Sequence, residues 1–141
     1  MKRLKLTLLL AAFALAASFA YAQNTDSTIA AKSNPNVYVG DKILAGKQFK
    51  EAILEAPFLT ATSKDGTEWN IVSYRVTFVR QISGNGVEDP PISVRGAGFS
   101  EEVIAKIQSA KSGTIIEFFE IRIQSIAGVR EINKPIVIRI L

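Results

Sequence analysis

Residues 95–102, RGAGFSEE, have the residue types of a dinucleotide-binding turn, because two glycines stand between an expected strand and an expected helix. In such a turn, the backbone amides at the start of the helix hold a pyrophosphate. Here Glu101 stands at the position of the third glycine, and Glu102 follows it. Two carboxylates at the helix start would repel phosphate groups, so a plain flexible turn is the favoured interpretation.

Three pairs of carboxylates have the chemistry for general acid and base catalysis, which requires two such groups in different environments. The pairs are Asp65 with Glu68, Glu88 with Asp89, and Glu101 with Glu102. All three lie in expected turns or at an expected helix start, where charged groups are normally solvated. We therefore predict that none of them is catalytic.

The chain contains no histidine and no cysteine. It therefore has neither an imidazole base nor a thiolate nucleophile, and no particular Ser-Lys pair stands out. The commonest ligands of transition metals are missing for the same reason, although a calcium site made of carboxylates stays open. We predict a protein that is not an enzyme and has no catalytic residue, cofactor or metal site.

Three aromatic residues, Tyr38, Trp69 and Tyr74, lie on expected strands. Together they would suit a platform that stacks on a sugar or a peptide. On strands, however, aromatic side chains more often pack in the core or across strands. Core packing is the favoured interpretation, and a ligand near Trp69 or Tyr74 is the alternative.

Residues 1–22 have the features of a secretory signal peptide. The start is basic, residues 6–17 form an apolar run, and Ala20 and Ala22 supply the small residues that signal peptidase requires. We expect cleavage after Ala22, so that the mature chain begins at Gln23 and is periplasmic or secreted. No later run reaches about 18 apolar residues, so no membrane span is expected after cleavage.

Removal of residues 1–22 also removes three of the 17 basic residues, which leaves 14 against 13 acidic residues and a net charge of +1. No positive excess for nucleic-acid binding remains. Residues 23–36 are polar and aperiodic, so they are expected to form a flexible leader. Residues 37–141 are then expected to form one domain.

The hydrophobic period changes at Gly113, within residues 98–124. Before Gly113 the spacing is helical, with Ser100 as the expected N-cap and a buried stripe of Val103, Ile104, Ile107 and Ala110. After it the pattern alternates, with Ile115, Phe119, Ile121 and Ile123 on one face and Ile116 and Phe118 on the other. We predict a short helix that ends near Gly113 and closes one end of a β-sandwich. On that helix, Lys106 is expected to contribute little to stability.

A second short helix is expected at residues 46–57, where Phe49, Ala52, Ile53 and Ala56 have helical spacing before Pro57. Residues 58–81 have the pattern of a hairpin, and Asp65-Gly66 suits a type I′ turn. In its second arm, one face is expected to contain Val72, Tyr74, Val76 and Phe78. The fold class that follows is mainly β: an immunoglobulin-like antiparallel β-sandwich of about seven strands with one or two short helices.

Parts of this pattern resemble the C-terminal β-domain of the GldM (PorM) family, which functions in gliding motility and type IX secretion. The similarity includes FSEEVIAKIQSAKSGTIIEFFEIRI, the closing PIVIRI, and the earlier segments VYVGDKI, FKEAIL and IVSYRVTFV. It covers residues 37–141 and consists of pattern and order, with no invariant motif.

The resemblance implies a periplasmic β-domain of Bacteroidetes that acts by contact with other envelope proteins. Members of the family are anchored by an N-terminal membrane helix and work with a motor partner. This chain has a cleavable signal in place of the anchor and lacks the helical and middle domains, so a motor role does not carry over. The resemblance does imply docking on an envelope protein, and it implies no catalytic or cofactor residue.

Partner binding is expected at a sheet edge, where unpaired amides accept an added strand. The candidates lie on the closing strand PIVIRIL, whose outward residues are Val137, Arg139 and Leu141, with NVYVG as the other possible edge. The predicted function is a non-enzymatic interaction module of the envelope. The alternative is a secreted module that binds carbohydrate or peptide.

Overall fold

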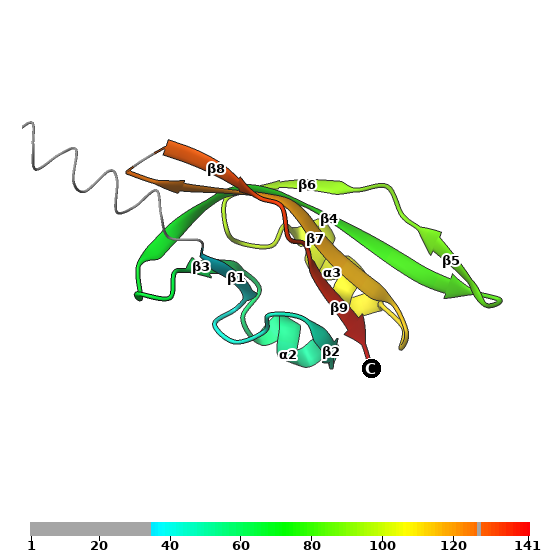
Figure 1. Ribbon diagram of the computed structural model, residues 1–141. Coiled ribbons are helices and arrows are strands. Elements are labelled where there is room, and N and C mark those ends of the chain that lie inside the picture. Colours follow the sequence, from blue (N-terminus) through cyan, green and yellow to red (C-terminus); the bar gives the residue numbers. More distant parts are fainter. Residues whose placement is uncertain (1–34, 127) are drawn as a thin grey trace, which may run out of the picture. The chain divides into compact units, whose positions relative to one another are not determined.

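The computed structural model describes residues 35–126 and 128–141, and these form nine strands and two helices (Figure 1). In chain order they are β1 (Asn36–Val39), β2 (Gly46–Gln48), α2 (Lys50–Glu55), β3 (Leu59–Thr62), β4 (Glu68–Ile82), β5 (Asn85–Glu88), β6 (Ile92–Arg95), α3 (Glu101–Ser109), β7 (Ile115–Ser125), β8 (Gly128–Ile132) and β9 (Ile136–Ile140). The predicted signal peptide, residues 1–22, and most of the predicted leader lie outside the described residues.

The two longest strands, β4 and β7, form the centre of the sheet and run antiparallel. On its other side β4 pairs in succession with β3, β6 and β5, and β7 pairs on its other side with β9 and then β8. β1 lies outside β3, and β2 lies outside β9. The sheet is curled (Figure 1), so the predicted mainly β, sandwich-like fold class is confirmed.

The sheet differs from the prediction in strand number and in one strand direction. Three strands, β2, β5 and β8, have no recognisable strand pattern in the sequence, because most of their residues are exposed and buried residues do not alternate with exposed ones. β2 also runs parallel to β9, so the sheet is mixed. The predicted purely antiparallel arrangement is wrong at this one pair.

Both central strands contain a bulge at the same level of the sheet. The residue pairing shifts between Ile71 and Ser73 and shifts again between Ser73 and Arg75. As a result, β4 buries Trp69 and Ile71 and then Tyr74, Val76 and Phe78, while β7 buries Ile116 and Phe118 and then Ile121 and Ile123. A bulge adds one residue to a strand, so the buried face changes from odd to even positions or the reverse.

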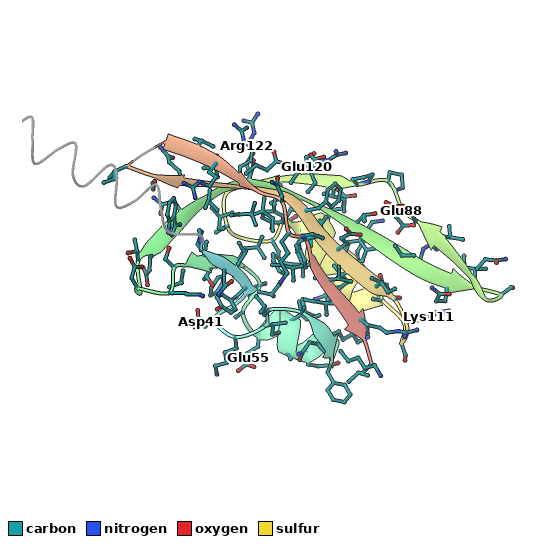
Figure 2. The ribbon with its side chains drawn as sticks, viewed as in Figure 1. Asp41, Glu55, Glu88, Lys111, Glu120 and Arg122 are labelled. Atoms are coloured by element: carbon teal, nitrogen blue, oxygen red, sulfur yellow. The ribbon has the colours of Figure 1, made fainter. Side chains whose placement is uncertain are left out.

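These bulges change the predicted faces: in β4 only Val72 departs from the face that it was predicted to share with Tyr74, Val76 and Phe78. Val72 is only half-buried. In β7, Phe119 is half-buried although Ile121 and Ile123, predicted on the same face, are buried, and Phe118 of the other predicted face is fully buried. Glu120 adopts a left-handed backbone (φ 48°), a conformation that is rare outside glycine. Its carboxylate lies 3.3 Å from the Arg75 guanidinium, which also stacks 5.4 Å from the Phe119 ring. Glu120 therefore lies on the outer side of the sheet (Figure 2).

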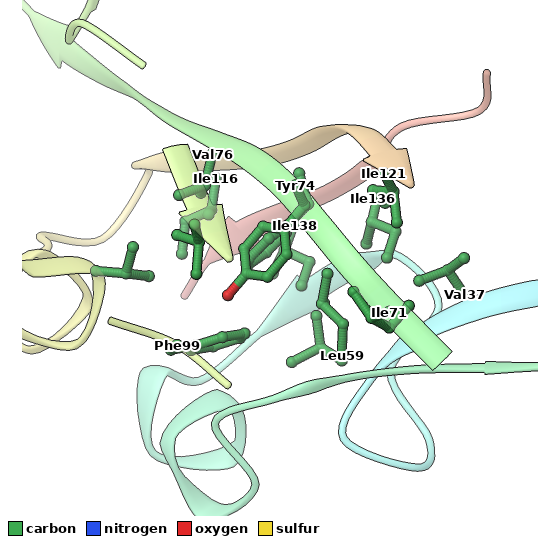
Figure 3. Packing of buried hydrophobic residues seen from close by; sticks show 14 of the residues in the cluster. Val37, Leu59, Ile71, Tyr74, Val76, Phe99, Ile116, Ile121, Ile136 and Ile138 are labelled. Atoms are coloured by element: carbon green, nitrogen blue, oxygen red, sulfur yellow. The ribbon is translucent and has the colours of Figure 1, made fainter. Parts of the chain in front are cut away.

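The core is centred on three aromatic rings that come from different parts of the chain. Phe118 of β7 lies 5.4 Å from Phe99, between centroids, and 6.0 Å from Tyr74 of β4. Figure 3 shows Tyr74 and Phe99 among aliphatic side chains of the sheet, such as Val76 and Ile138. Packing of this kind provides most of the free energy that favours folding.

α3 covers this core, as the helical spacing predicts. Val103 and Ile107 are fully buried, and the Ser100 hydroxyl accepts a hydrogen bond from the Val103 amide (3.3 Å). The helix ends at Ser109, four residues before Gly113. Gly113 instead belongs to the turn into β7 (φ 89°), and its amide donates to the Ile140 carbonyl oxygen. Its predicted role as the residue that ends the helix is therefore wrong.

α2 is the second predicted helix. Ile53 is fully buried, but Phe49, which the spacing also placed on the buried face, is 62% exposed at the N-cap position. The helix is only six residues long and begins after Phe49, so the Phe49 side chain does not lie on its buried face. The Lys50 ammonium donates to the Gln108 carbonyl oxygen (3.0 Å) and connects α2 to α3.

Two hairpin turns are distributed differently from the prediction. The β3–β4 hairpin forms at Asp65-Gly66 as expected, but only Gly66 of the two has a positive φ (86°), so the turn is not type I′. The positive φ pair of a type I′ turn occurs instead at Ser83 (50°) and Gly84 (82°), between β4 and β5. Residues 83–91, SGNGVEDPP, therefore contain a hairpin turn and the strand β5.

Candidate protein-interaction site

β9 carries the residues predicted to accept a partner strand, but it is not an edge strand. It pairs with β7 on one side, and Ile138–Ile140 pair in parallel with β2 on the other. The Leu141 amide donates to the Gln48 carbonyl oxygen (3.0 Å), which extends the ladder with β2. The edge hypothesis for Val137, Arg139 and Leu141 is therefore wrong, because β2 lies along that side of the strand.

β1, the other predicted edge, is at the end of the strand order but is almost closed. The Gly40 amide donates to the Phe58 carbonyl oxygen, so by alternation Val37 and Val39 direct their backbone groups away from β3. Val39 exchanges backbone hydrogen bonds with Ile43 (2.7 and 3.2 Å). Among the described residues of this edge, only Val37 is left for a partner strand, and Pro35, two residues before it, has no amide hydrogen. Such an edge is poorly suited to strand addition.

β8 is an edge strand without these obstructions. Among the described strands it pairs with β7 alone, and Ser125 and Gly128 close the hairpin. Since the pair that closes a two-residue turn is hydrogen-bonded, Val129 and Glu131 direct their backbone groups away from β7. No backbone hydrogen bond from β8 to another segment occurs among residues 35–126 and 128–141. β8 contains neither proline nor lysine, the residues that commonly block an edge.

The tip of the β7–β8 hairpin exposes apolar side chains. Ile126 is 78% exposed and Val129 is 51% exposed, although both are β-branched residues that normally favour burial on a strand. On the other face of β8, the Arg130 guanidinium stacks 5.5 Å from the buried Trp69 ring and holds the hairpin against the core. The hairpin thus joins an open edge to an exposed apolar tip.

A groove of about 420 Å³ lies elsewhere, between the end of α3 and the end of β4. It is lined by Phe78, Arg80, Gln81, Ile82, Asp89, Lys106, Ser109, Ala110, Lys111, Ser112 and Thr114. Three of these side chains are cationic and one is anionic. The groove is therefore positively charged, with apolar side chains between the charges.

Asp89 organises the charges at this groove. One carboxylate oxygen accepts from Arg80 (2.7 and 3.1 Å), and the other accepts from Lys106 (2.9 Å). The side chain is only 14% exposed. The hydrogen bond from Lys106, helped by Arg80, holds the pKa of Asp89 below its ordinary value of 3.8. Asp89 is thus not the solvated carboxylate that the sequence suggested.

Replacement of Asp89 by asparagine is expected to lower the free energy of unfolding by about 1 to 2 kcal/mol at pH 7, because two charge-assisted hydrogen bonds are weakened at a partly exposed site. The folded-state pKa is below 3.8, so this stabilisation is present above about pH 4 and is lost as the pH falls through the folded-state pKa. Urea unfolding from pH 7 to pH 3 measures it. The exposed Glu88→Gln is the control, and equal effects of both variants would contradict the role of Asp89.

Neither the family models nor the curated proteins include a match to this chain. The interaction site is therefore inferred from its geometry.

The aromatic residues that could have stacked on a ligand lie mainly in the core. Tyr74 is 1% exposed and its hydroxyl donates to the Gly98 carbonyl oxygen (3.0 Å), while burial raises its pKa. Trp69 is 6% exposed, and its indole nitrogen donates to the Ser63 hydroxyl (2.7 Å). Core packing, the favoured interpretation, is confirmed for both rings. Only Tyr38 is half-exposed, beside a second groove of about 500 Å³.

The remaining candidates are not brought together into a reactive site. Glu101 and Glu102 are exposed at the start of α3, and the turn between β6 and α3 contacts β3, because the Ala97 carbonyl oxygen accepts from the Leu59 amide. In the described part of the chain, no three metal-binding side chains cluster. No helix there has the length and apolar character needed to cross a membrane. Sequence patterns gave no indication of the β8 edge, because its apolar residues do not match its burial: Val129 is exposed, whereas Arg130 is half-buried.

Proposed function

We propose that this chain is a non-enzymatic interaction module of the bacterial cell envelope, which binds a protein partner by strand addition to β8. The observation that carries the proposal is the open edge of β8 beside the exposed tip residues Ile126 and Val129. Strand addition provides affinity through main-chain hydrogen bonds, and neighbouring apolar side chains provide specificity. Natural proteins usually block such edges when they are not used.

The resemblance to the terminal domain of the GldM family supports the same proposal. That domain acts by docking on other envelope proteins, and the segment that includes β7 and α3 carries most of the similarity. The proposed setting is therefore the periplasm or cell surface of a bacterium of the Bacteroidetes, in connection with gliding motility or type IX secretion.

Val129→Pro provides the sharpest test of strand addition. Proline removes the Val129 amide hydrogen, which points away from β7, so the β7 ladder keeps its hydrogen bonds. Proximity labelling in the native envelope first identifies the partner, and binding to that purified partner is then measured. We expect Val129→Pro to weaken binding about tenfold or more, because one hydrogen bond and the approach of the added strand are lost.

Val129→Thr is the matched control, since it keeps both the amide and the β-branched shape. It is expected to bind within about threefold of the wild type, because no main-chain hydrogen bond changes. Full binding by a folded Val129→Pro protein would refute strand addition at β8. Folding is checked by the melting temperature of each variant.

The proposed location makes a separate prediction about processing. We expect protein recovered from an envelope or culture fraction to begin at Gln23, because Ala20 and Ala22 follow an apolar run of suitable length. Intact-mass measurement reads this directly. A mass that includes Met1 would contradict secretion by this route.

Carbohydrate binding is a second candidate, favoured by the groove beside Tyr38. Its lining includes Asp41, Thr60, Glu68 and Asn70, which offer hydrogen-bond partners next to a half-exposed aromatic ring. Sugar sites commonly combine these two features. A glycan array with the wild type and Tyr38→Ala distinguishes the candidates, since only a sugar site predicts glycan signals that Tyr38→Ala abolishes.

A further inference from the structure

We propose that the groove between α3 and the end of β4 binds an extended, apolar peptide segment that carries a carboxylate. This is a second site, independent of the proposed strand addition at β8. Its shape arises because β4 is longer than its neighbour. The last residue pair between β4 and β7 is Val79 with Ile115, so Arg80–Ile82 continue past β7 with only β5 at their side.

The backbone of Arg80–Ile82, which extend past β7, can form hydrogen bonds with an extended chain. Ser83-Gly84 form a two-residue turn, so the closing pair Ile82–Asn85 is hydrogen-bonded and Gln81 directs its amide and carbonyl away from β5. At that level β7 has turned away, since the Gly113 amide donates to the Ile140 carbonyl oxygen instead. No backbone hydrogen bond of Gln81 to another segment occurs among the described residues. A bound peptide would therefore lie where β7 would have continued.

The side chains of the groove add an apolar floor. Phe78, Arg80 and Ile82 share one face of β4, and Lys106 of α3 lies 5.6 Å from the Phe78 ring on that face. Ile82 is 48% exposed there, and Val87, opposite Arg80 on β5, is 39% exposed. An apolar side chain of the peptide would cover this surface and remove it from water.

The charges select a carboxylate. Arg80 and Lys106 share the single carboxylate of Asp89, and Lys111 has no ion-pair partner among the described residues. Lys111 lies at the end of the domain where β7 begins, exposed to solvent (Figure 2). The groove therefore has a positive excess that one acidic side chain would reduce, which favours an acidic over a neutral or basic segment.

A peptide fits these features better than a phosphate ligand does. A dianionic phosphate requires several free, convergent donors, whereas Arg80 and Lys106 already bind Asp89 and its carboxylate would repel the phosphate. An extended peptide needs only one cation, one backbone donor and acceptor, and an apolar surface. All three are present at Lys111, Gln81 and Ile82.

The test uses the mature full chain and three hexapeptides that alternate valine with glutamate, glutamine or lysine, each with a fluorophore at the N-terminus and an amidated C-terminus, so that only the side chains differ in charge. Binding is measured by fluorescence anisotropy at low salt. We expect the glutamate peptide to bind about two- to fivefold more tightly than the glutamine peptide, as one exposed ion pair allows, and the lysine peptide to bind most weakly. The preference should decrease as salt is added.

Lys111→Glu is expected to abolish the preference for glutamate, while Lys64→Glu, the same charge change at the remote β3–β4 turn, is expected to retain it. Ile82→Ser should weaken the binding of both the acidic and the neutral peptide.

Equal affinity for the glutamate and glutamine peptides, or an unchanged preference in Lys111→Glu, would overturn the proposal. Lys111-dependent binding to anionic vesicles without any peptide binding would overturn it in favour of lipid, and Lys111-dependent self-association in favour of a second copy. Val129→Pro should bind all three peptides as the wild type does, which separates this site from β8.

Discussion

Replacement of Phe118 by alanine is expected to lower the free energy of unfolding by about 3 to 5 kcal/mol. Phe118 is fully buried, and its ring contacts those of Phe99 and Tyr74 at the centre of the core. Removal of the ring loses its buried apolar area and leaves a cavity that the rings of Phe99 and Tyr74 cannot easily fill. Urea unfolding followed by circular dichroism measures the loss.

Phe119→Ala is the matched control, because it removes the same side chain from the next residue. Phe119 lies on the opposite side of the bulged strand, half-buried under Arg75. Its truncation is expected to cost about 1 kcal/mol, mainly through the lost contact with the guanidinium. Equal losses for the two variants would show that the change of face in β7 does not occur in solution.

Ile107→Ala is expected to cost about 2 to 4 kcal/mol, since a fully buried side chain of α3 is truncated above the core. Gln108→Ala, one position further along the helix and exposed, is expected to change stability by less than about 0.5 kcal/mol. Thermal melts of both variants measure the difference. A similar shift for both would mean that α3 does not cover the core.

The sequence suggested Lys106 as the neutral comparison for Ile107, and the structure rules it out. Lys106 donates to Asp89 and lies over the Phe78 ring, so its truncation would change two interactions. Periodicity identified the face on which a residue lies but not its partners from β4 and from the loop after β5. Those partners are distant in sequence, and their approach depends on how the strands pair.

Local patterns predicted the elements well where one face is buried. The stripe containing Val103 and Ile107 identified α3, and the alternation of Ile136, Ile138 and Ile140 identified β9, which buries all three. The same reasoning failed for β2, whose three residues are mostly exposed. Since β2 is what covers β9, one missed short strand was enough to misplace the predicted edge.

The two candidate sites were beyond sequence reasoning for a related reason. The groove at Lys111 exists because β4 continues past the start of β7. The β8 edge exists because no further strand among the described residues pairs with β8. Ile82 and Val129 are ordinary strand residues in the sequence, and only their exposure in the fold distinguishes them. Pairing between distant strands fixes that exposure, and no local pattern encodes it.

The matched bulges of β4 and β7 determine which insertions and deletions the domain tolerates. Deletion of Val72 alone would remove the bulge of β4 and restore its regular alternation, while Ile71–Ile123 and Ser73–Arg122 would become consecutive pairs and the later pairs would stay in place. Deletion of Glu120 alone would do the same from the other strand. Deletion of both would keep Ile71 opposite Ile123 and Val76 opposite Phe118 in an unbroken ladder. A one-residue deletion should therefore be tolerated at either place, because it removes one bulge without changing which buried residues face each other.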